Sequence, residues 1–396
     1  MQMKSILNKL SPKLLSIFKH LHDHPEISWQ EVNTTNYIVE LLESEGFQPK
    51  RFEHCTGLYV DIGEGIPLVG LRADMDALWQ EVDGQMCANH SCGHDGHMTI
   101  GIGVLLLLKQ LNAQLNGAVR VIFQPAEEKG GGALKVIEQG VVDSLAYLFS
   151  VHVRPIQELQ DGHYSPALFH GAAKAFVGEI IGEDAHAARP HLGQNAIEIG
   201  ASIVHALATI HHDPMVPASL KLTRFQAGGE STNIIPGRAE FSIDVRAQRN
   251  DVMEKLEQQI LRQIEAIGRL YEVKIHITEV TSIVAAQVSE QAQAILSQAI
   301  VDTVGVKNLQ PAIHTPGGED FHYYSVKRPQ LKATMLGLGC GLSPGLHHPQ
   351  MSFNENRLIT GVEILTRTVL SALQHAKNEE VETYVRISNS KGINNN

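Results

Sequence analysis

Two periodicities of hydrophobic and polar residues alternate along the first 160 residues of the chain. Short continuous apolar runs predict three buried strands, at residues 68–71, 119–123 and 147–153. Apolar residues at helical spacing predict four helices, at residues 11–24, 28–46, 99–111 and 133–140. The first two helices are expected to begin at caps, one at Ser11 before Pro12 and one at a capping box from Ser28 to Glu31. Strands that alternate with helices in this way predict the α/β class with a mostly parallel sheet.

The pattern changes in the middle of the chain. Between residues 173 and 285 it predicts two helices, at 195–211 and 251–271, and four strands, at 174–182, 220–226, 239–246 and 273–280. The α/β alternation then returns with a helix to residue 304, a strand at 333–338 and a helix at 358–376. We therefore expect a discontinuous first domain that is interrupted by a smaller inserted α+β domain, followed by a disordered polar tail. The predicted bounds are 1–172 and 286–384, 173–285, and 385–396 respectively.

The composition narrows the class of protein. The 396 residues are 43% hydrophobic and 19% charged, which is typical of a protein with a packed core. A formal charge of −11 disfavours binding to nucleic acid or to an anionic membrane, so neither is expected as a partner. The longest apolar stretch, residues 100–108, is far shorter than the roughly 18 residues of a spanning helix. Four scattered cysteines and no recognisable signal peptide predict a cytoplasmic protein.

Side chains that bind metals gather where predicted strands end, which is where an open α/β sheet forms its ligand crevice. Imidazole, carboxylate and thiolate groups are the ligand types that divalent transition metals use. Any one of these residues, taken alone, is more often a solvated or structural residue. Together the clusters predict a metal site. They are Asp74 and Asp76; Cys92, His94, Asp95 and His97; Glu127 and Glu128; His152; and His347 with His348.

The neighbouring Glu127 and Glu128 indicate what such a site does. Adjacent side chains at the end of an extended strand diverge, so both carboxylates cannot bind one metal ion. One carboxylate is expected to bind the metal, while the other stays free to accept and release protons. A free carboxylate beside a metal ion is the usual equipment for hydrolysis.

Four motifs occur in order along the chain: GLRADMDAL at 70–78, HSCGHDGH at 90–97, FQPAEE at 123–128 and GGEDF at 317–321. Together they closely resemble the amidohydrolase branch of the aminoacylase/carboxypeptidase-type metallopeptidases. That branch includes N-acyl-amino-acid deacylases, hippurate hydrolases and auxin-conjugate hydrolases, and the resemblance covers about residues 14–375. It implies a metallopeptidase domain with two divalent ions per subunit, zinc or manganese. It also implies an inserted lid that serves for dimerisation, hence a homodimer or a dimer of dimers.

The resemblance also implies a role for individual residues. Glu127 is expected to be the general base, and Asp76 is expected to orient a ligand. In the lid, His186 is expected to stabilise the oxyanion, often across the dimer, while Asn233 and Arg246 bind the substrate carboxylate. His347 is favoured over His348 as the last ligand, because the family's ligand stands two places before the proline. The implied metal ligands are Cys92, His94, Glu128, His152 and His347.

The expected reaction is hydrolysis of the amide bond of an N-acyl amino acid, a small-molecule substrate. Two departures from the family pattern, the short segment 82–86 and Asn195-Ala196, bear on the preferred acyl group. A dipeptidase or aminopeptidase with the same two metals is one alternative. A catalytically silent metal- or peptide-binding protein is another, but it has no need for a proton-accepting carboxylate at Glu127 beside the ligand Glu128.

Overall fold

The computed structural model describes residues 2–111, 115 and 117–392, and side chains as far as residue 379. The chain divides into two compact units. The first comprises Met1–Leu168, Gln287–Ile313 and Asp320–Asn396, and the second comprises Phe169–Ala286 and His314–Glu319. The chain enters the second unit within β9 (Leu168–His170) and leaves it after Ala286, so the second unit is an insertion into the first; a short segment that begins within β16 (Ile313–Thr315) also belongs to the second unit.

A seven-stranded sheet forms the centre of the first unit, with the strand order β1-β2-β6-β3-β7-β17-β8. The four central strands β6, β3, β7 and β17 are parallel, and the outer strands pair antiparallel. Their bounds are β1 (Lys50–Arg51), β2 (Leu58–Gly63), β3 (Pro67–Asp74), β6 (Ala118–Gln124), β7 (Tyr147–Pro155), β8 (Tyr164–Ser165) and β17 (Lys332–Leu342).

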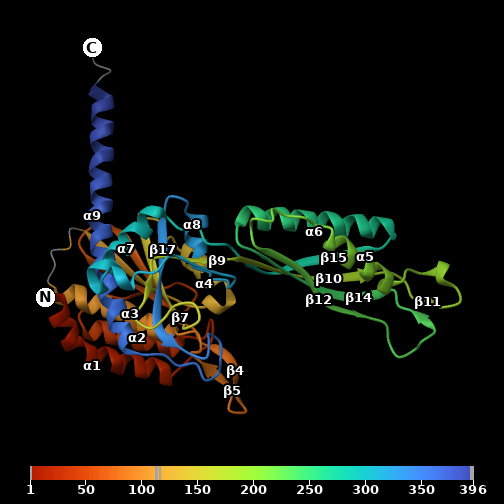
Figure 1. Ribbon diagram of the computed structural model, residues 1–396, viewed down its shortest axis with the longest axis horizontal. Helices are drawn as coiled ribbons and strands as arrows, with labels where there is room; N and C mark the ends of the chain where they lie inside the picture. Colours follow the sequence, from red (N-terminus) through yellow and green to blue (C-terminus); the bar gives the residue numbers. More distant parts are fainter. Residues whose placement is uncertain (1, 112–114, 116, 393–396) are drawn as a thin grey trace. The chain divides into compact units, whose positions relative to one another are not determined.

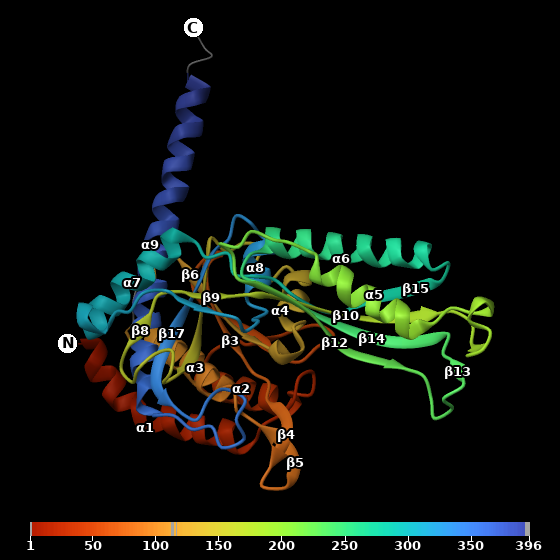
Figure 2. The ribbon, with the colours of Figure 1, turned by 45° about the vertical axis from the view of Figure 1, so that its right-hand side comes forward.

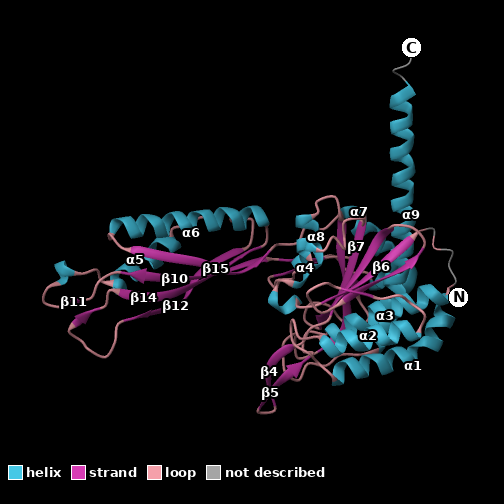
Figure 3. Ribbon diagram, turned by 180° about the vertical axis from the view of Figure 1, so that it is seen from behind, coloured by secondary structure: helices cyan, strands magenta, loops and turns pink. Residues whose placement is uncertain are grey.

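Helices cover both faces of this sheet (Figures 1 and 3). One face contacts α3, α7 and α9, with α1 packed outside α3, and the other contacts α4 and α8. The helices of this unit are α1 (Gln2–Asp23), α2 (Val32–Ser44), α3 (His94–Gln110), α4 (Gly132–Glu138), α7 (Glu290–Val304), α8 (His322–Lys327) and α9 (Asn356–Gly392), with 3-10 turns η1 (Glu127–Lys129) and η3 (Val306–Asn308).

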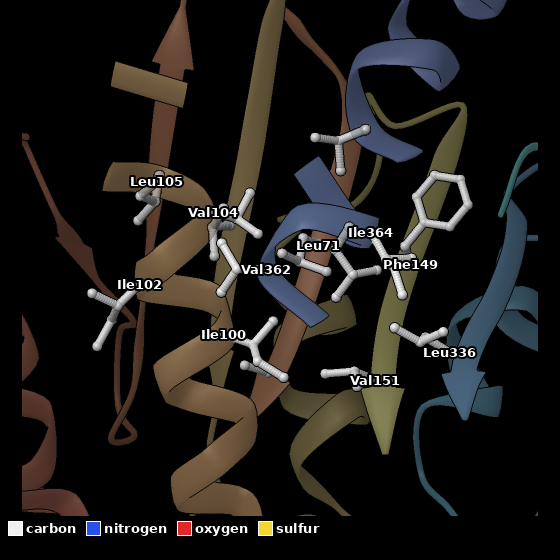
Figure 4. Packing of buried hydrophobic residues seen from close by; sticks show 14 of the residues in the cluster. Leu71, Ile100, Ile102, Val104, Leu105, Phe149, Val151, Leu336, Val362 and Ile364 are labelled. Carbon is white, nitrogen blue, oxygen red and sulfur yellow. The ribbon is translucent and has the colours of Figure 1, made fainter. Parts of the chain in front are cut away.

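Helix α3 lies at the centre of the hydrophobic core. Every residue from His94 to Leu108 is buried, which is typical of a helix that is covered on all sides. Figure 4 shows Ile100 and Val104 of this helix near Leu71 of β3 and Val362 of α9. The N-terminus of α3, which carries the CGHDGH motif, is thereby held rigidly at the sheet.

Three predicted helix starts are wrong. The helix expected from residue 99 already begins at His94, so most of the CGHDGH motif lies in the first turn of α3. Helix α1 begins at Gln2 rather than Ser11, because Pro12 is accommodated inside the helix and the Ser11 hydroxyl donates to the Leu7 carbonyl. Helix α2 begins at Val32 without a side-chain cap, because Ser28 and Glu31 form hydrogen bonds elsewhere. At the other end of the chain, α9 continues to Gly392 across most of the predicted tail at 385–396, and residues 393–396 lie outside the described residues.

The short segment at 82–86 is the turn of a hairpin, β4 (Leu78–Val82) and β5 (Gln85–Asn89). Asp83 and Gly84 both have positive φ, 49° and 82°, as a two-residue turn of the hairpin type requires. The hairpin ends directly before His90, so it leads into the CGHDGH motif.

The inserted unit contains an antiparallel sheet of four strands in the order β12-β14-β10-β15, with α5 and α6 packed on it (Figure 2). Gly178 of β10 stands opposite Phe241 of β14, and a Cβ atom there would lie 2.0 Å from the Phe241 ring, so only glycine fits. The elements are β10 (Ala172–Ile181), β11 (Ala185–His186), β12 (Ala218–Ala227), β13 (Ile234–Ile235), β14 (Arg238–Ala247), β15 (Lys274–Ile283), α5 (Ala196–Ala208), α6 (Asn250–Leu270) and the 3-10 turn η2 (Pro190–Leu192).

These observations confirm the predicted fold class, a mainly parallel α/β domain with a smaller inserted α+β domain. None of the helices in the described part of the chain combines the length and the apolar character needed to cross a membrane.

Candidate metal centre

The chemistry-bearing motifs meet at one edge of the central sheet. Strands β3, β6, β7 and β17 are parallel neighbours, so their carboxyl ends lie at the same edge. Asp74 ends β3, Glu127 follows β6 by three residues, His152 lies near the end of β7, and His347 follows β17. The expected crevice at the strand ends is therefore where these residues gather.

The five expected ligands form two groups that share Cys92. Cys92, His94 and His152 have candidate ligand atoms within 4.8 Å of one another, and so do Cys92, Glu128 and His347. The Cys92 sulfur lies 3.6 Å from His152 Nε2, and His347 Nε2 lies 3.4 Å from Glu128 Oε1. Two groups with one shared thiol fit a pair of neighbouring metal ions with Cys92 between them.

Two buried atoms of this cluster support a metal site. Among the described residues, His94 Nε2 and Glu128 Oε1 have no hydrogen-bond partner, although buried polar atoms nearly always have one. His94 Nδ1 lies 2.8 Å from the backbone carbonyl of Asp76, so Nδ1 carries the hydrogen and the lone pair of Nε2 is left for a metal ion. Thiolate, imidazole and carboxylate donors together suit zinc, and the nitrogen and oxygen donors also suit manganese.

Protons compete with metal ions for the same atoms. Burial raises the pKa of the Cys92 thiol, and the neighbouring Glu128 raises it further. The neighbouring Cys92 sulfur and Glu128 carboxylate raise the pKa of His347 to about 10. Because a metal binds the thiolate and the neutral imidazole, its binding releases these protons and depends on pH.

Asp76 supports the turn that carries both glutamates. Its Oδ1 accepts a hydrogen bond of 3.1 Å from the Glu127 amide, and its Oδ2 accepts one of 3.0 Å from the Glu128 amide. The Ser28 hydroxyl also donates to Oδ2, at 2.6 Å, and Oδ1 lies 3.3 Å from His94 Nδ1. The sequence-based prediction gave Asp76 one ligand to orient, whereas the structure places it against both His94 and the glutamate turn.

Glu127 and Glu128 lie differently within this turn. Glu127 is buried, and its Oε1 accepts a hydrogen bond of 3.4 Å from the Asp320 amide. Its Oε2 lies 3.9 Å from His94 Nε2, at the border of the cluster, while Glu128 contacts His347. Candidate ligand atoms of Glu127, Glu128 and His94 also lie within 4.8 Å of one another, because the two glutamates stand in a 3-10 turn and not at an extended strand end. The predicted divergence of the two side chains is therefore wrong, and the division of their roles stays a prediction.

Sequence reasoning missed three supporting residues. Glu31 accepts hydrogen bonds from the Ala126 amide and the Thr56 hydroxyl, and thereby holds the chain just before Glu127. The Ser28 hydroxyl donates to Asp76, although the sequence pattern predicts that Ser28 and Glu31 cap a helix. Arg72 lies beside two of the expected clusters but was given no role. The RADMD and GGEDF motifs were the only signals that pointed to Arg72 and its partner Asp320.

The lid residues fall into two places within the inserted unit. His186 pairs with Ile234 in a short strand pair, and the Asn233 carbonyl accepts the Ala187 amide, so His186 and Asn233 are neighbours. Arg246 lies at the far end of β14, eight residues beyond its start, or roughly 27 Å away at 3.4 Å per residue. The structure therefore brings Asn233 to His186 and not to Arg246 of the same lid.

Arg246 lines a small pocket of about 210 Å³ in the inserted unit, together with Ser219 and Gln248. Its guanidinium forms a two-pronged ion pair with Asp244, at 3.0 Å for both Nε and Nη2. Both side chains are partly exposed, so a second carboxylate can reach the guanidinium from the solvent.

Comparisons with known proteins agree with this geometry. Residues 70–371 match the profile of the peptidase family M20/M25/M40. The chain is 32% identical to an N-acetyl-L-cysteine deacetylase of Bacillus subtilis, over 89% of this chain and 86% of that protein. It is 31% identical to a probable hydrolase of Synechocystis, over 92% and 97% of the two chains. A dinuclear metal-binding peptidase of Bacillus subtilis superposes with a TM-score of 0.78 at 28% identity, over 93% and 99% of the two chains.

Proposed function

The chain belongs to the peptidase family M20/M25/M40 and is a metal-dependent amidohydrolase, and from this premise we propose that it hydrolyses N-acyl amino acids. The observation that carries the proposal is the pair Glu127 and Glu128 beside His94, of which Glu128 alone also lies in a candidate ligand group with Cys92 and His347. Relatives that are named for deacetylation of N-acetylcysteine support this class of substrate.

The proposed site divides its residues between binding and proton transfer. The ligand set holds two divalent ions, zinc or manganese, which when bound polarise the amide carbonyl and lower the pKa of a water molecule. Glu127 takes the proton of the attacking water and passes it to the nitrogen of the departing amine. Asp76 keeps the glutamate turn in place through its two amide hydrogen bonds. The ligands in this proposal are Cys92, His94, Glu128, His152 and His347.

The separation of the lid residues supports a dimer. His186, proposed to stabilise the oxyanion, lies in the two-stranded sheet of β11 and β13, whereas Arg246, proposed to bind the substrate carboxylate, lies near the far end of β14 in the four-stranded sheet. An N-acetyl amino acid is far shorter than this separation, so one lid alone cannot supply both residues to one substrate. We therefore propose a homodimer, or a dimer of dimers, in which the two residues come from different subunits. The ten-residue strand β12 is an edge of the lid sheet, and such an edge is a place where another chain can pair.

A substrate panel tests the proposed reaction. Wild-type enzyme loaded with Mn²⁺ or Zn²⁺ is assayed with N-acetyl and N-benzoyl amino acids and with dipeptides of the same C-terminal residue. We expect kcat/KM for the best N-acyl substrate to exceed that for the matched dipeptide at least tenfold. The Glu127→Gln variant, purified in parallel, controls for contaminating hydrolases. A preference for dipeptides would assign the enzyme to the peptidases of the family instead.

A further inference from the structure

Asp74 is a fully buried carboxylate beside the ligand cluster for which the proposed reaction has no use. Its Oδ1 accepts a hydrogen bond of 2.6 Å from His97 Nδ1, and its Oδ2 accepts one from Arg72. The same Oδ2 lies 3.7 Å from His94 Nε2, the atom left for a metal ion. The carboxylate is thus fixed by two donors at a position that faces the ligand atom of His94.

His97 is oriented by contacts at both ring nitrogens. Its Nε2 accepts the Val153 amide at 3.0 Å, so its hydrogen resides on Nδ1 and is donated to Asp74. Because the Nε2 lone pair is engaged by this amide, His97 is a poor candidate for a metal ligand, although it lies close to Asp74 and His94. Val153 directly follows His152, so His97 also ties Asp74 to the strand end that carries this proposed ligand.

A buried guanidinium lies between Asp74 and a second carboxylate. The guanidinium of Arg72 is fully buried and donates to Asp74, to Asp320 at 2.8 Å and to Gln124 at 2.9 Å. One guanidinium thus faces two buried carboxylates, of which Asp74 also lies against His94. A buried negative charge is costly unless a cation lies nearby.

We propose that Asp74 is a positioning residue of the metal centre: held by His97 and Arg72, it sets a fixed negative charge against His94 and so strengthens cation binding without being a ligand. The inference rests on the ligand set proposed above. It adds to that set a supporting group that determines how tightly the metal is held. Supporting groups of this kind typically contribute 10- to 100-fold to metal affinity.

The test measures the affinity of the folded, metal-free protein for Mn²⁺ by calorimetric titration, with circular dichroism to verify the fold of each variant. Asp74→Asn keeps the shape of the side chain and removes its charge, and we expect a Kd for Mn²⁺ that is 10- to 100-fold higher than in the wild type. Asp320→Asn is the matched control, because it also breaks an ion pair between Arg72 and a fully buried carboxylate. We expect its Kd to change by less than threefold.

Two results would overturn the proposal. One is a Kd for Asp74→Asn within threefold of the wild-type value, and the other is equal weakening by Asp320→Asn, which would indicate a general loss of packing. A wild-type protein that binds no Mn²⁺ and no Zn²⁺ would instead refute the proposed ligand set, so the two failures are distinguishable.

A pair of His97 variants keeps the proposal testable if Asp74→Asn does not fold. In His97→Asn the amide occupies the place of Nδ1 and retains the donor to Asp74, whereas in His97→Gln it reaches the place of Nε2 and retains only the acceptor for Val153. We expect the Asn variant to bind Mn²⁺ more tightly than the Gln variant. Equal affinities or the reverse order would overturn the role of the Asp74 contact.

Discussion

Replacing Glu127 by Gln removes the proposed base while changing the shape of the site very little. The amide is isosteric with the carboxylate, and its oxygen can still accept the hydrogen bond that the Asp320 amide donates at 3.4 Å. The backbone amide of residue 127 also keeps its contact with Asp76. The variant is therefore expected to fold and to bind metal like the wild type, so that a loss of activity reports on proton transfer.

The structure places the expected loss of kcat in the upper part of the range that is usual when a general base is removed. A general base contributes about 10²- to 10⁴-fold to the rate, and each factor of ten corresponds to about 1.36 kcal/mol of activation free energy. Asp76, a carboxylate close to the glutamate turn, is a poor substitute, because both of its oxygens accept hydrogen bonds from the amides of Glu127 and Glu128. We expect kcat to fall by about 10³- to 10⁴-fold, or about 4–5.4 kcal/mol.

The assay compares Glu127→Gln with Glu128→Gln, which is the same chemical change one residue further along the chain. For each variant kcat is measured with the best substrate of the panel, and bound metal is measured by elemental analysis. Glu127→Gln should retain its metal and lose turnover, whereas Glu128→Gln should lose metal, because Glu128 lies in the group with Cys92 and His347. A kcat for Glu127→Gln within tenfold of the wild type, or an equal loss of metal in both variants, would refute the division of roles.

Three further predictions follow from the same geometry. Cys92→Ala should reduce the metal content measured by elemental analysis, while Cys92→Asp should restore part of it, since a carboxylate can also bridge two ions; unchanged content in the Ala variant would contradict the ligand role. Mixed dimers of His186→Ala and Arg246→Ala protomers should recover up to about half of the wild-type activity, because one of the two sites then has both residues intact. Verified heterodimers without activity would argue for a site within one chain. The hydrogen bond from Asp95 raises the pKa of His22, so the folded state holds this proton more tightly than the unfolded state. Below about pH 6.5 the ion pair should add roughly 0.2–1 kcal/mol to the free energy of unfolding, a small amount because His22 is half exposed. This contribution should vanish as the pH rises through the pKa of His22 in the folded state. The difference in thermal stability between the wild type and His22→Gln should thus be larger at pH 6 than at pH 9, and a constant difference would contradict the ion pair.

The strand ends could be predicted from the sequence because they depend on local patterns. A buried apolar run followed by Asp74, or by Glu127, is visible in one sequence, and parallel pairing then brings such ends to the same edge. His347 lies some 200 residues beyond the other expected ligands; its residue type made the pair His347 and His348 a candidate, but only the family resemblance favoured His347 over His348. The position of Asn233 beside His186 depends on the pairing of β11 with β13, which no local pattern specifies.

The misread capping box shows why supporting residues are harder to find. The residue types at Ser28 and Glu31 are those of a helix start, yet Ser28 bonds to Asp76 and Glu31 to the Ala126 amide. Both partners are remote in the sequence, so the local pattern predicted a helix cap where the fold uses the same side chains to support the glutamate turn. Arg72 and Asp320 are a further case, since 248 positions separate the two halves of a fully buried ion pair.

The motif RADMD acquires a physical explanation from strand geometry. Side chains alternate across a strand, so Arg72 and Asp74 point to one side of β3, and Asp76 continues that spacing just beyond the strand end. Ala73 and Met75, between them, belong to the hydrophobic core. One strand thus supports two parts of the site: Asp74 faces His94, and Asp76 holds the turn with both glutamates. A one-residue shift of this strand would exchange the polar and apolar sides, so the spacing of the motif is required by the core and by the metal centre at once.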